Sequence, residues 1–193
     1  MALGTWFAET RPQFLLLSVT LVLVGSAAAA ADGPFSPLLF ALTLAGLVLL
    51  HAGCNVFNDW FDYRSGIDLE TKRPPFSGGS GFLPGGAMTP RAAFVLGALA
   101  LAGGCAAGIA LTALTSPWLL AIGFAGVFLA VAYNPLLSKI MLGEIAAGAG
   151  LGFLPVIVTY FAVKMPSMLD MTLLLNGKHD VAIIIAECIL TAK

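Results

Sequence analysis

The chain has 193 residues, of which 59% are hydrophobic and 10% are charged, with a formal net charge of −1. A soluble domain carries about 25% charged residues, so this composition indicates an integral membrane protein that lies in the lipid bilayer. The near-zero charge and the lack of a basic run argue against a nucleic-acid partner. Cys54, Cys105 and Cys188 form no CxxC or Cys/His pattern, which argues against disulfides and zinc.

Apolar runs divide the chain into membrane spans. Because about 20 apolar residues cross a bilayer, we predict an all-α, multi-span bundle with about five transmembrane helices and a short C-terminal segment. The predicted spans are residues 14–31, 38–57, 92–115, 118–132 and 145–163. The first has an alternative, because Arg11, an apolar run and the alanines of 27–31 also fit a cleavable signal peptide.

The second span ends in the most informative segment, residues 55–68. Pro37 is expected to begin this helix and Gly66 to end it in a left-handed conformation. Helical spacings of three, four and seven return to one face. This face carries Asn55, Asn58, Asp59 and Asp62. The opposite face, for lipid or neighbouring helices, carries Val56, Phe57, Trp60 and Phe61.

An acidic face in a membrane helix is costly, roughly 2.5–3.5 kcal/mol for an Asp at the helix centre, so such residues usually line a bundle interior or a cavity. Carboxylate and amide oxygens without His or Cys suit Mg²⁺, which usually also binds phosphate oxygens of a substrate. The predicted metal ligands are Asn58, Asp59, Asp62 and Asp68, the last folding back from beyond the helix end. The alternative is that these side chains are solvated ion pairs at the membrane interface.

Cations and glycines follow the acidic face. Lys72 and Arg73 precede a Gly-rich run at 77–86, whose backbone N–H groups could bind an anion, although a flexible connector is the alternative. Tyr133 and Lys139, after the fourth span, are predicted to contact a diphosphate; alternatively they are an interfacial aromatic and an orientation charge.

Other residues of the spans have structural predictions. We expect His51, one turn before Asn55, to be a hydrogen-bonded structural residue. Gly-x-x-x-Gly pairs predict close helix packing in the third and fifth spans. The glycines concerned are Gly97, Gly103, Gly104, Gly108, Gly148 and Gly152.

The loop charges predict the orientation. With a cytoplasmic N-terminus, the second and fourth connections face the cytoplasm and carry all the cations of the connections, whereas the first and third carry no Lys or Arg. This pattern obeys the positive-inside rule. The acidic face is therefore expected to open toward the cytoplasm.

The pattern Asn55-x-x-Asn58-Asp59-x-x-Asp62-Tyr63-x-x-Gly66-x-Asp68 resembles the first aspartate-rich motif of the UbiA superfamily of intramembrane prenyltransferases. Its form is most similar to the 1,4-dihydroxy-2-naphthoate polyprenyltransferase branch. Further agreement comes from Arg11-Pro12, Arg73-Pro74, Gly78-Gly79-Ser80 and Gly143-Glu144. The resemblance covers about residues 5–163.

The resemblance implies the N-terminal part of a fold of about nine membrane helices, in two similar halves around a central cavity. It implies Mg²⁺-dependent transfer of a polyprenyl group from a polyprenyl diphosphate to an electron-rich, often aromatic acceptor, as in menaquinone biosynthesis, in a bacterial or archaeal cell membrane. Asp59 and Asp62 would be catalytic. The implied substrate-binding residues are Asn55, Asn58, Asp68, Lys72, Arg73, Tyr133 and Lys139.

Residues 164–193 do not continue the resemblance, and Asp170 and Asp180 are not at the spacing that would make a second aspartate-rich motif. We therefore divide the chain into a prenyltransferase-like domain, 1–163, and an atypical or truncated tail, 164–193, and expect little activity from the chain alone unless a second copy pairs with it as a homo-oligomer. The alternatives are a non-catalytic protein that binds prenyl diphosphate lipids and a cation transporter. The position of the acidic face at one membrane side disfavours the transporter.

Overall fold

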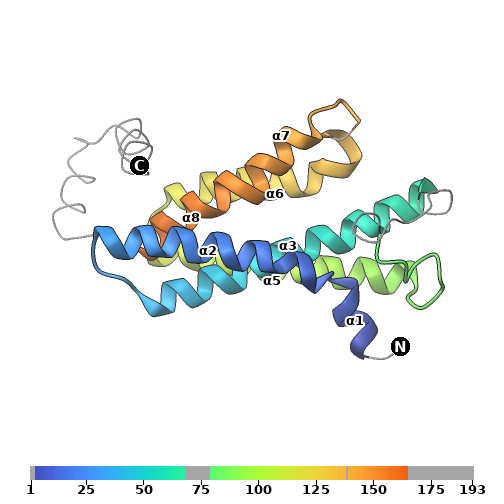
Figure 1. Cartoon of the computed structure of the whole chain (residues 1–193), viewed down its shortest axis with the longest axis horizontal. Coiled ribbons are helices and arrows are strands. Elements are labelled where there is room, and N and C mark those ends of the chain that lie inside the picture. Colours follow the sequence, from blue (N-terminus) through green and yellow to red (C-terminus); the bar gives the residue numbers. More distant parts are fainter. Residues whose placement is uncertain (1–2, 68–78, 138, 165–193) are drawn as a thin grey trace.

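The computed structural model describes residues 3–67, 79–137 and 139–164, and within these ranges it is helical apart from turns and one isolated β-bridge between Phe35 and Lys164 (Figure 1). The α-helices are α1 (Leu3–Glu9), α2 (Pro12–Asp32), α3 (Pro37–Ser65), α5 (Pro90–Leu114), α6 (Trp118–Ala132), α7 (Gly143–Gly148) and α8 (Leu154–Val163). Two π-helical segments are η1 (Tyr133–Leu137) and η2 (Ala149–Phe153). The predicted site residues Asp68, Lys72 and Arg73, and the tail from residue 165 on, lie outside the described residues.

Four helical segments of the described chain are long and apolar enough to cross a membrane. They are Pro12–Asp32, Pro37–Ser65, Pro90–Leu114 and Gly143–Val163. The predicted fourth span corresponds to the shorter apolar helix α6. The multi-span helical bundle predicted from the apolar runs is therefore confirmed.

Helix α3 begins and ends as its sequence predicts. Pro37 lies in its first turn, and the Ser36 hydroxyl oxygen caps the helix by accepting a hydrogen bond from the Leu39 N–H at 3.3 Å. Proline fits the first turn because its missing N–H would be unpaired there in any case. Gly66 ends the helix with φ of 84°, a left-handed conformation that costs glycine little.

Helices α3 and α5 run antiparallel and pack closely, and α8 packs on α2 (Figure 1). A Cβ on Gly104 of α5 would lie 2.6 Å from Leu50 of α3, so only glycine permits this approach. The packing prediction also holds for Gly97 and Gly103, which have neighbours within 4 Å. It is wrong for Gly108, Gly148 and Gly152, because a Cβ there would meet open space.

The closest approach to the last span is made instead by Gly25 of α2, where a Cβ would lie 2.6 Å from the Val156 carbonyl oxygen. Within that span, the π-helical segment η2 separates α7 from α8. Pro155 accounts for it, because proline lacks the N–H that would donate to the Leu151 carbonyl in a regular α-helix. The wider turn brings Leu151 to the wall of a pocket described below.

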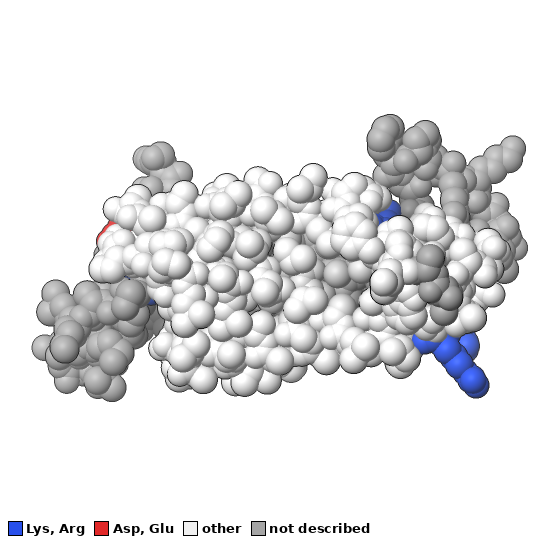
Figure 2. Space-filling view, turned by 90° about the horizontal axis from the view of Figure 1, so that it is seen from below, with Lys and Arg blue, Asp and Glu red and all other residues white. Residues whose placement is uncertain are grey.

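The bundle has two ends (Figure 1). At one, which we call the motif end, α1 joins α2, α3 finishes, α5 begins and η1 leads to α7. At the other, which we call the Asp32 end, α2 joins α3 and α8 finishes. The side of the molecule seen in Figure 2 is white along its middle, with charged side chains only toward the ends. A charge-free middle suits the apolar core of a bilayer.

Candidate functional site

Asp59 is the centre of the polar face of α3. Its side chain is buried, with only 1% of the residue exposed. Carboxylate oxygen Oδ1 lies 3.5 Å from Nη1 of Arg11, and Oδ2 accepts a hydrogen bond from the Ser80 backbone N–H at 2.5 Å. A buried carboxylate needs such partners, because leaving water without them costs several kcal/mol.

Arg11 holds an unusual backbone conformation beside this carboxylate. It is the residue before α2, with φ 56° and ψ 60° in the left-handed region, followed directly by Pro12. For a residue other than glycine this conformation costs roughly 1–2 kcal/mol. The guanidinium carbon stacks 4.5 Å from the centre of the Phe14 ring. The left-handed turn thus changes the direction of the chain between α1 and α2 and directs Arg11 to Asp59.

The residues Glu9, Thr10 and Arg11, which we call the N-terminal turn, contact the site at two more points. Asn55 Nδ2 donates a hydrogen bond to the Thr10 carbonyl at 3.0 Å. Glu9 is fully buried, and its Oε2 accepts a hydrogen bond from the Ser80 hydroxyl at 2.5 Å. The turn therefore joins the polar face of α3 to the loop before α5.

The described part of that loop, residues 79–89, is folded against the bundle. Leu83 and Met88 are buried in a cluster with Val56 of α3 and Ala93 of α5. Backbone hydrogen bonds within the loop include one from Met88 N–H to the Phe82 carbonyl at 3.0 Å. These contacts hold Ser80 over the acidic face, and its N–H binds a carboxylate of the protein itself.

The apolar face of α3 packs where the sequence predicted neighbouring helices. Phe57 and Trp60 both contact Phe94 of α5, with ring centres 5.5 and 5.4 Å apart. Phe57 also lies against Gly97, where a Cβ would be 3.0 Å from the ring. This packing fixes the rotation of α3, and so directs Asn55 and Asp59 toward the N-terminal turn.

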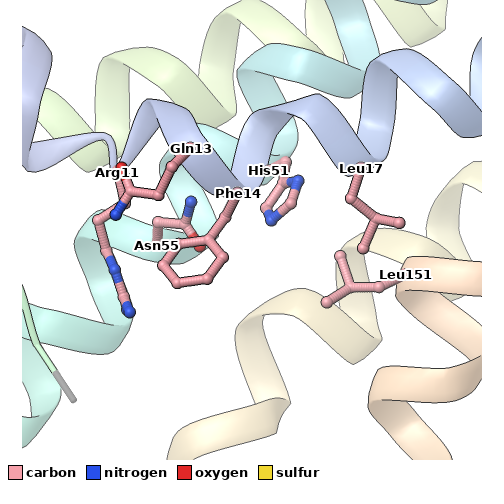
Figure 3. Close-up of a pocket in the computed structure, with 7 residues that line it drawn as sticks. All are labelled: Arg11, Gln13, Phe14, Leu17, His51, Asn55 and Leu151. Carbon is pink, nitrogen blue, oxygen red and sulfur yellow. The ribbon is translucent and has the colours of Figure 1, made fainter. Parts of the chain in front are cut away.

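A pocket of about 280 Å³ lies beside the polar face (Figure 3). Its lining comprises Arg11, Gln13, Phe14, Leu17, His51, Asn55 and Leu151. Figure 3 shows Arg11 and Asn55 at one side of the pocket and Leu17 and Leu151 at the other. One wall is therefore polar, and the other surfaces are apolar.

His51 is hydrogen-bonded, as predicted, with its Nδ1 2.8 Å from the Ser18 hydroxyl oxygen. It also lines a second, mainly apolar cavity of about 130 Å³ that shares Leu151 with the first. Small residues such as Gly104 and Gly126 form much of that cavity's wall. The pocket at the motif end and this mainly apolar cavity therefore share His51 and Leu151 in their linings.

The other predicted site residues lie at the same end of the bundle. Asn58 and Asp62 are half-buried on α3 and engaged in contacts with the protein. Tyr133 is half-buried in η1, which contacts α3, and Lys139 is exposed after it. Neither lines the pocket of Figure 3. Among the described residues, no three His, Cys, Asp or Glu side chains gather as a metal site would require, and the predicted ligand Asp68 lies outside them.

Sequence reasoning missed three residues at this site. Arg11 was named only in the signal-peptide alternative and in the family resemblance, and Glu9 and Ser80 were given no role of their own. A charged residue directly before a membrane span was an available signal for Arg11. Glu9 and Ser80 meet only because the chain folds back, so spacing along the sequence could not reveal their contact.

Membrane-length helices around a buried aspartate, with a partly polar pocket beside it, define the class of this protein: a membrane-embedded helical bundle. Residues 18–187 match the UbiA prenyltransferase family, and this chain belongs to that family. The match begins within α2 and runs past Val163 into residues that were expected to be an atypical tail.

Three relatives share part of this sequence. A 1,4-dihydroxy-2-naphthoate octaprenyltransferase of Mycobacterium tuberculosis is 33% identical over 118 residues, 61% of this chain and 39% of the relative. The Bacillus subtilis protein of the same name is 26% identical over 155 residues, 79% of this chain and 49% of the relative. UbiA prenyltransferase domain-containing protein 1 of Dictyostelium discoideum is 42% identical over 64 residues, 33% and 19% of the two chains. The matched region thus spans less than half of each relative.

Proposed function

We propose that this chain provides one acidic motif and one pocket wall of a polyprenyltransferase, which moves a prenyl group from a prenyl diphosphate to an electron-rich aromatic acceptor. The observation that carries the proposal is the buried carboxylate of Asp59, held by Arg11 and Ser80 next to the 280 Å³ pocket. Membership of the UbiA family and two relatives named as naphthoate octaprenyltransferases support the reaction and an acceptor of the dihydroxynaphthoate type, as in menaquinone biosynthesis.

Mg²⁺ is the cofactor that the donor chemistry favours. Its proposed ligands remain Asn58, Asp59, Asp62 and Asp68, all of which offer oxygen atoms. Asp59 contacts Arg11 through Oδ1 and the Ser80 N–H through Oδ2, and an ionised carboxylate offers about four lone-pair sites, which are also the positions that bind a metal. Bound Mg²⁺ would supply positive charge to the departing diphosphate.

The chain's own residues would bind and shield the reactants. Arg11 lies on the pocket wall, where its guanidinium can fork onto phosphate oxygens, and Lys72, Arg73, Tyr133 and Lys139 are proposed as further diphosphate contacts. Phe14, Leu17 and Leu151 make the rest of the wall apolar, which would keep water from an allylic carbocation.

The proposed site faces the cytoplasm. Of the Lys and Arg residues that the structure describes, Arg11, Arg64, Arg91 and Lys139 belong to the elements of the motif end, and Lys164 alone belongs to the Asp32 end. By the positive-inside rule, this distribution supports a motif end and an N-terminus that face the cytoplasm. The cell membrane of a bacterium or archaeon is the location proposed.

The first prediction tests the site. In purified, detergent-solubilised protein, Asp59→Asn and Asp62→Asn should each weaken Mg²⁺-dependent binding of geranylgeranyl diphosphate roughly 10-fold or more, about 1.4 kcal/mol, because each removes an anionic ligand. Asp32→Asn, at the other end of the bundle, is the control and should bind like the wild type. Equal binding by wild type and Asp59→Asn would refute the proposed site.

A protein that binds prenyl diphosphate without transferring it would pass that test. Adding 1,4-dihydroxy-2-naphthoate and searching for the prenylated product by mass spectrometry separates the two functions. Product that forms with the wild type and fails to form with Asp59→Asn identifies the transferase. Binding without product identifies the binding protein.

A further inference from the structure

Two buried carboxylates, one near the N-terminus and one in α3, are joined through a single serine. Ser80 donates its hydroxyl hydrogen to Glu9 Oε2 and its backbone N–H to Asp59 Oδ2, both at 2.5 Å. The Ser80 hydroxyl oxygen also accepts a hydrogen bond from the Phe82 N–H at 3.2 Å. Ser80 is therefore held at three points, and its N–H direction toward Asp59 depends on its hydroxyl contact with Glu9.

The position of Glu9 is not explained by the stability of its own helix. It is the last residue of α1, fully buried, where the helix dipole disfavours a negative charge. Burying a carboxylate costs several kcal/mol before its partners are counted. What the buried side chain contributes here is an acceptor oxygen for the Ser80 hydroxyl, a contact outside its own helix that does not require a charge.

We infer that Glu9 is a positioning residue for Asp59 and acts through Ser80. By accepting the Ser80 hydroxyl, Glu9 fixes the loop backbone so that the Ser80 N–H takes one lone pair of Asp59 Oδ2 and orients the carboxylate toward the proposed ligand. The N-terminal turn and the Gly-rich loop then both position the Asp59 carboxylate. Arg11 contacts its Oδ1 and the Ser80 N–H binds its Oδ2. This inference rests on the proposed function, because it assumes that Asp59 binds Mg²⁺ and diphosphate.

The test is the Mg²⁺ concentration that gives half-maximal binding of geranylgeranyl diphosphate, with the melting temperature measured in the same detergent. Glu9→Ala and Ser80→Ala should each raise that concentration about 10-fold, as loss of an outer-shell partner typically does for a metal ligand. Glu9→Gln should stay within about 2-fold of wild type, because its amide oxygen still accepts the Ser80 hydroxyl. Thr20→Val, which removes an exposed hydroxyl on α2, should change nothing.

A double-mutant cycle shows whether Glu9 acts through Ser80. In a Ser80→Ala background, Glu9→Ala should add less than about 2-fold, since residues that act through one contact are not additive. Two full, additive effects would overturn the route through Ser80. An unchanged Mg²⁺ requirement in Glu9→Ala, with a lowered melting temperature, would overturn the inference and leave Glu9 a structural residue.

Two safeguards keep the test decisive. If Glu9→Ala does not fold, the comparison of Ser80→Ala with Glu9→Gln takes its place in the test. A wild-type Mg²⁺ requirement in Ser80→Ala would then overturn the inference. Asp59→Asn is measured alongside. If Asp59→Asn binds geranylgeranyl diphosphate like the wild type, both the proposed function and the inference fail. If Asp59→Asn loses binding but Glu9→Ala and Ser80→Ala do not change the Mg²⁺ requirement, only the inference is refuted.

Discussion

The two ends of the bundle each hold a small polar cluster, and the clusters use the same chemistry in opposite settings. At the Asp32 end, the Tyr160 hydroxyl donates to Asp32 Oδ2 at 2.6 Å in an exposed position, and Lys164 Nζ donates to the Tyr160 oxygen at 3.0 Å in a partly buried one. At the motif end, Asp59 and Glu9 are buried with partners of the same kinds, an arginine and a hydroxyl.

Burial decides how much these polar clusters contribute to the stability of the protein. Exposed ion pairs and hydrogen bonds exchange with water and contribute about 0–1 kcal/mol, so the Asp32 end is a link between α2 and α8. At the motif end water cannot replace a missing partner, so loss of one leaves a charge uncompensated. The comparison therefore predicts that equivalent substitutions at the two ends differ in their effects on both stability and ligand binding.

The largest expected effect is that of Arg11→Ala. It removes the Arg11 guanidinium from the buried Asp59 carboxylate, and breaking a buried pair in this way costs about 3 kcal/mol. A clearly lowered melting temperature in detergent is the expected result, together with weaker binding of prenyl diphosphate. Arg91→Ala is the matched control, because Arg91 is an exposed arginine at the same end. Equal melting temperatures for the two variants would contradict the importance given to burial.

An intermediate effect is expected from Gly25→Ala, which separates α2 from α8 without touching the acidic face. The added Cβ would lie 2.6 Å from the Val156 carbonyl oxygen and 2.8 Å from Thr159 Cβ, and such overpacking costs about 1–3 kcal/mol. Melting should drop while Mg²⁺-dependent binding of the remaining folded protein persists. Gly108→Ala is the control, since a Cβ there meets open space and alanine favours a helix by about 0.5–1 kcal/mol. A Gly25→Ala variant that is as stable as Gly108→Ala would show that α2 and α8 do not cross this closely.

The smallest effect is expected from Tyr160→Phe. It removes the hydroxyl that joins Asp32 to Lys164, and a partly exposed hydrogen bond of this kind contributes less than about 1 kcal/mol. Differential scanning fluorimetry should register a slight decrease in melting temperature, and binding of geranylgeranyl diphosphate should equal that of the wild type. A loss of binding would show that the Asp32 end communicates with the site, and the contrast between the two ends would fail.

Helix α3 shows which features of the structure follow from the sequence alone. Its apolar length, Pro37 at the start and Gly66 at the end determine a membrane helix with those limits, and the spacing of Asn55 and Asp59 determines that they share a face. These properties follow from backbone geometry and hydrogen bonding within one segment, so a sequence contains them. The family resemblance, too, was carried by this local motif. The predicted roles of Asp68, Lys72 and Arg73 stay predictions, because these residues lie outside the described structure.

The tertiary structure alone decided what the acidic face meets. The contacts of Asp59 with Arg11 and Ser80 join segments far apart in the chain, and the Glu9–Ser80 contact joins two segments outside the membrane helices. Likewise, Gly25 rather than Gly148 makes the close approach between α2 and the last span. Helical periodicity gives the direction of a side chain relative to its own helix, but the crossing of helices and the path of loops determine its neighbours, and these depend on packing across the whole bundle.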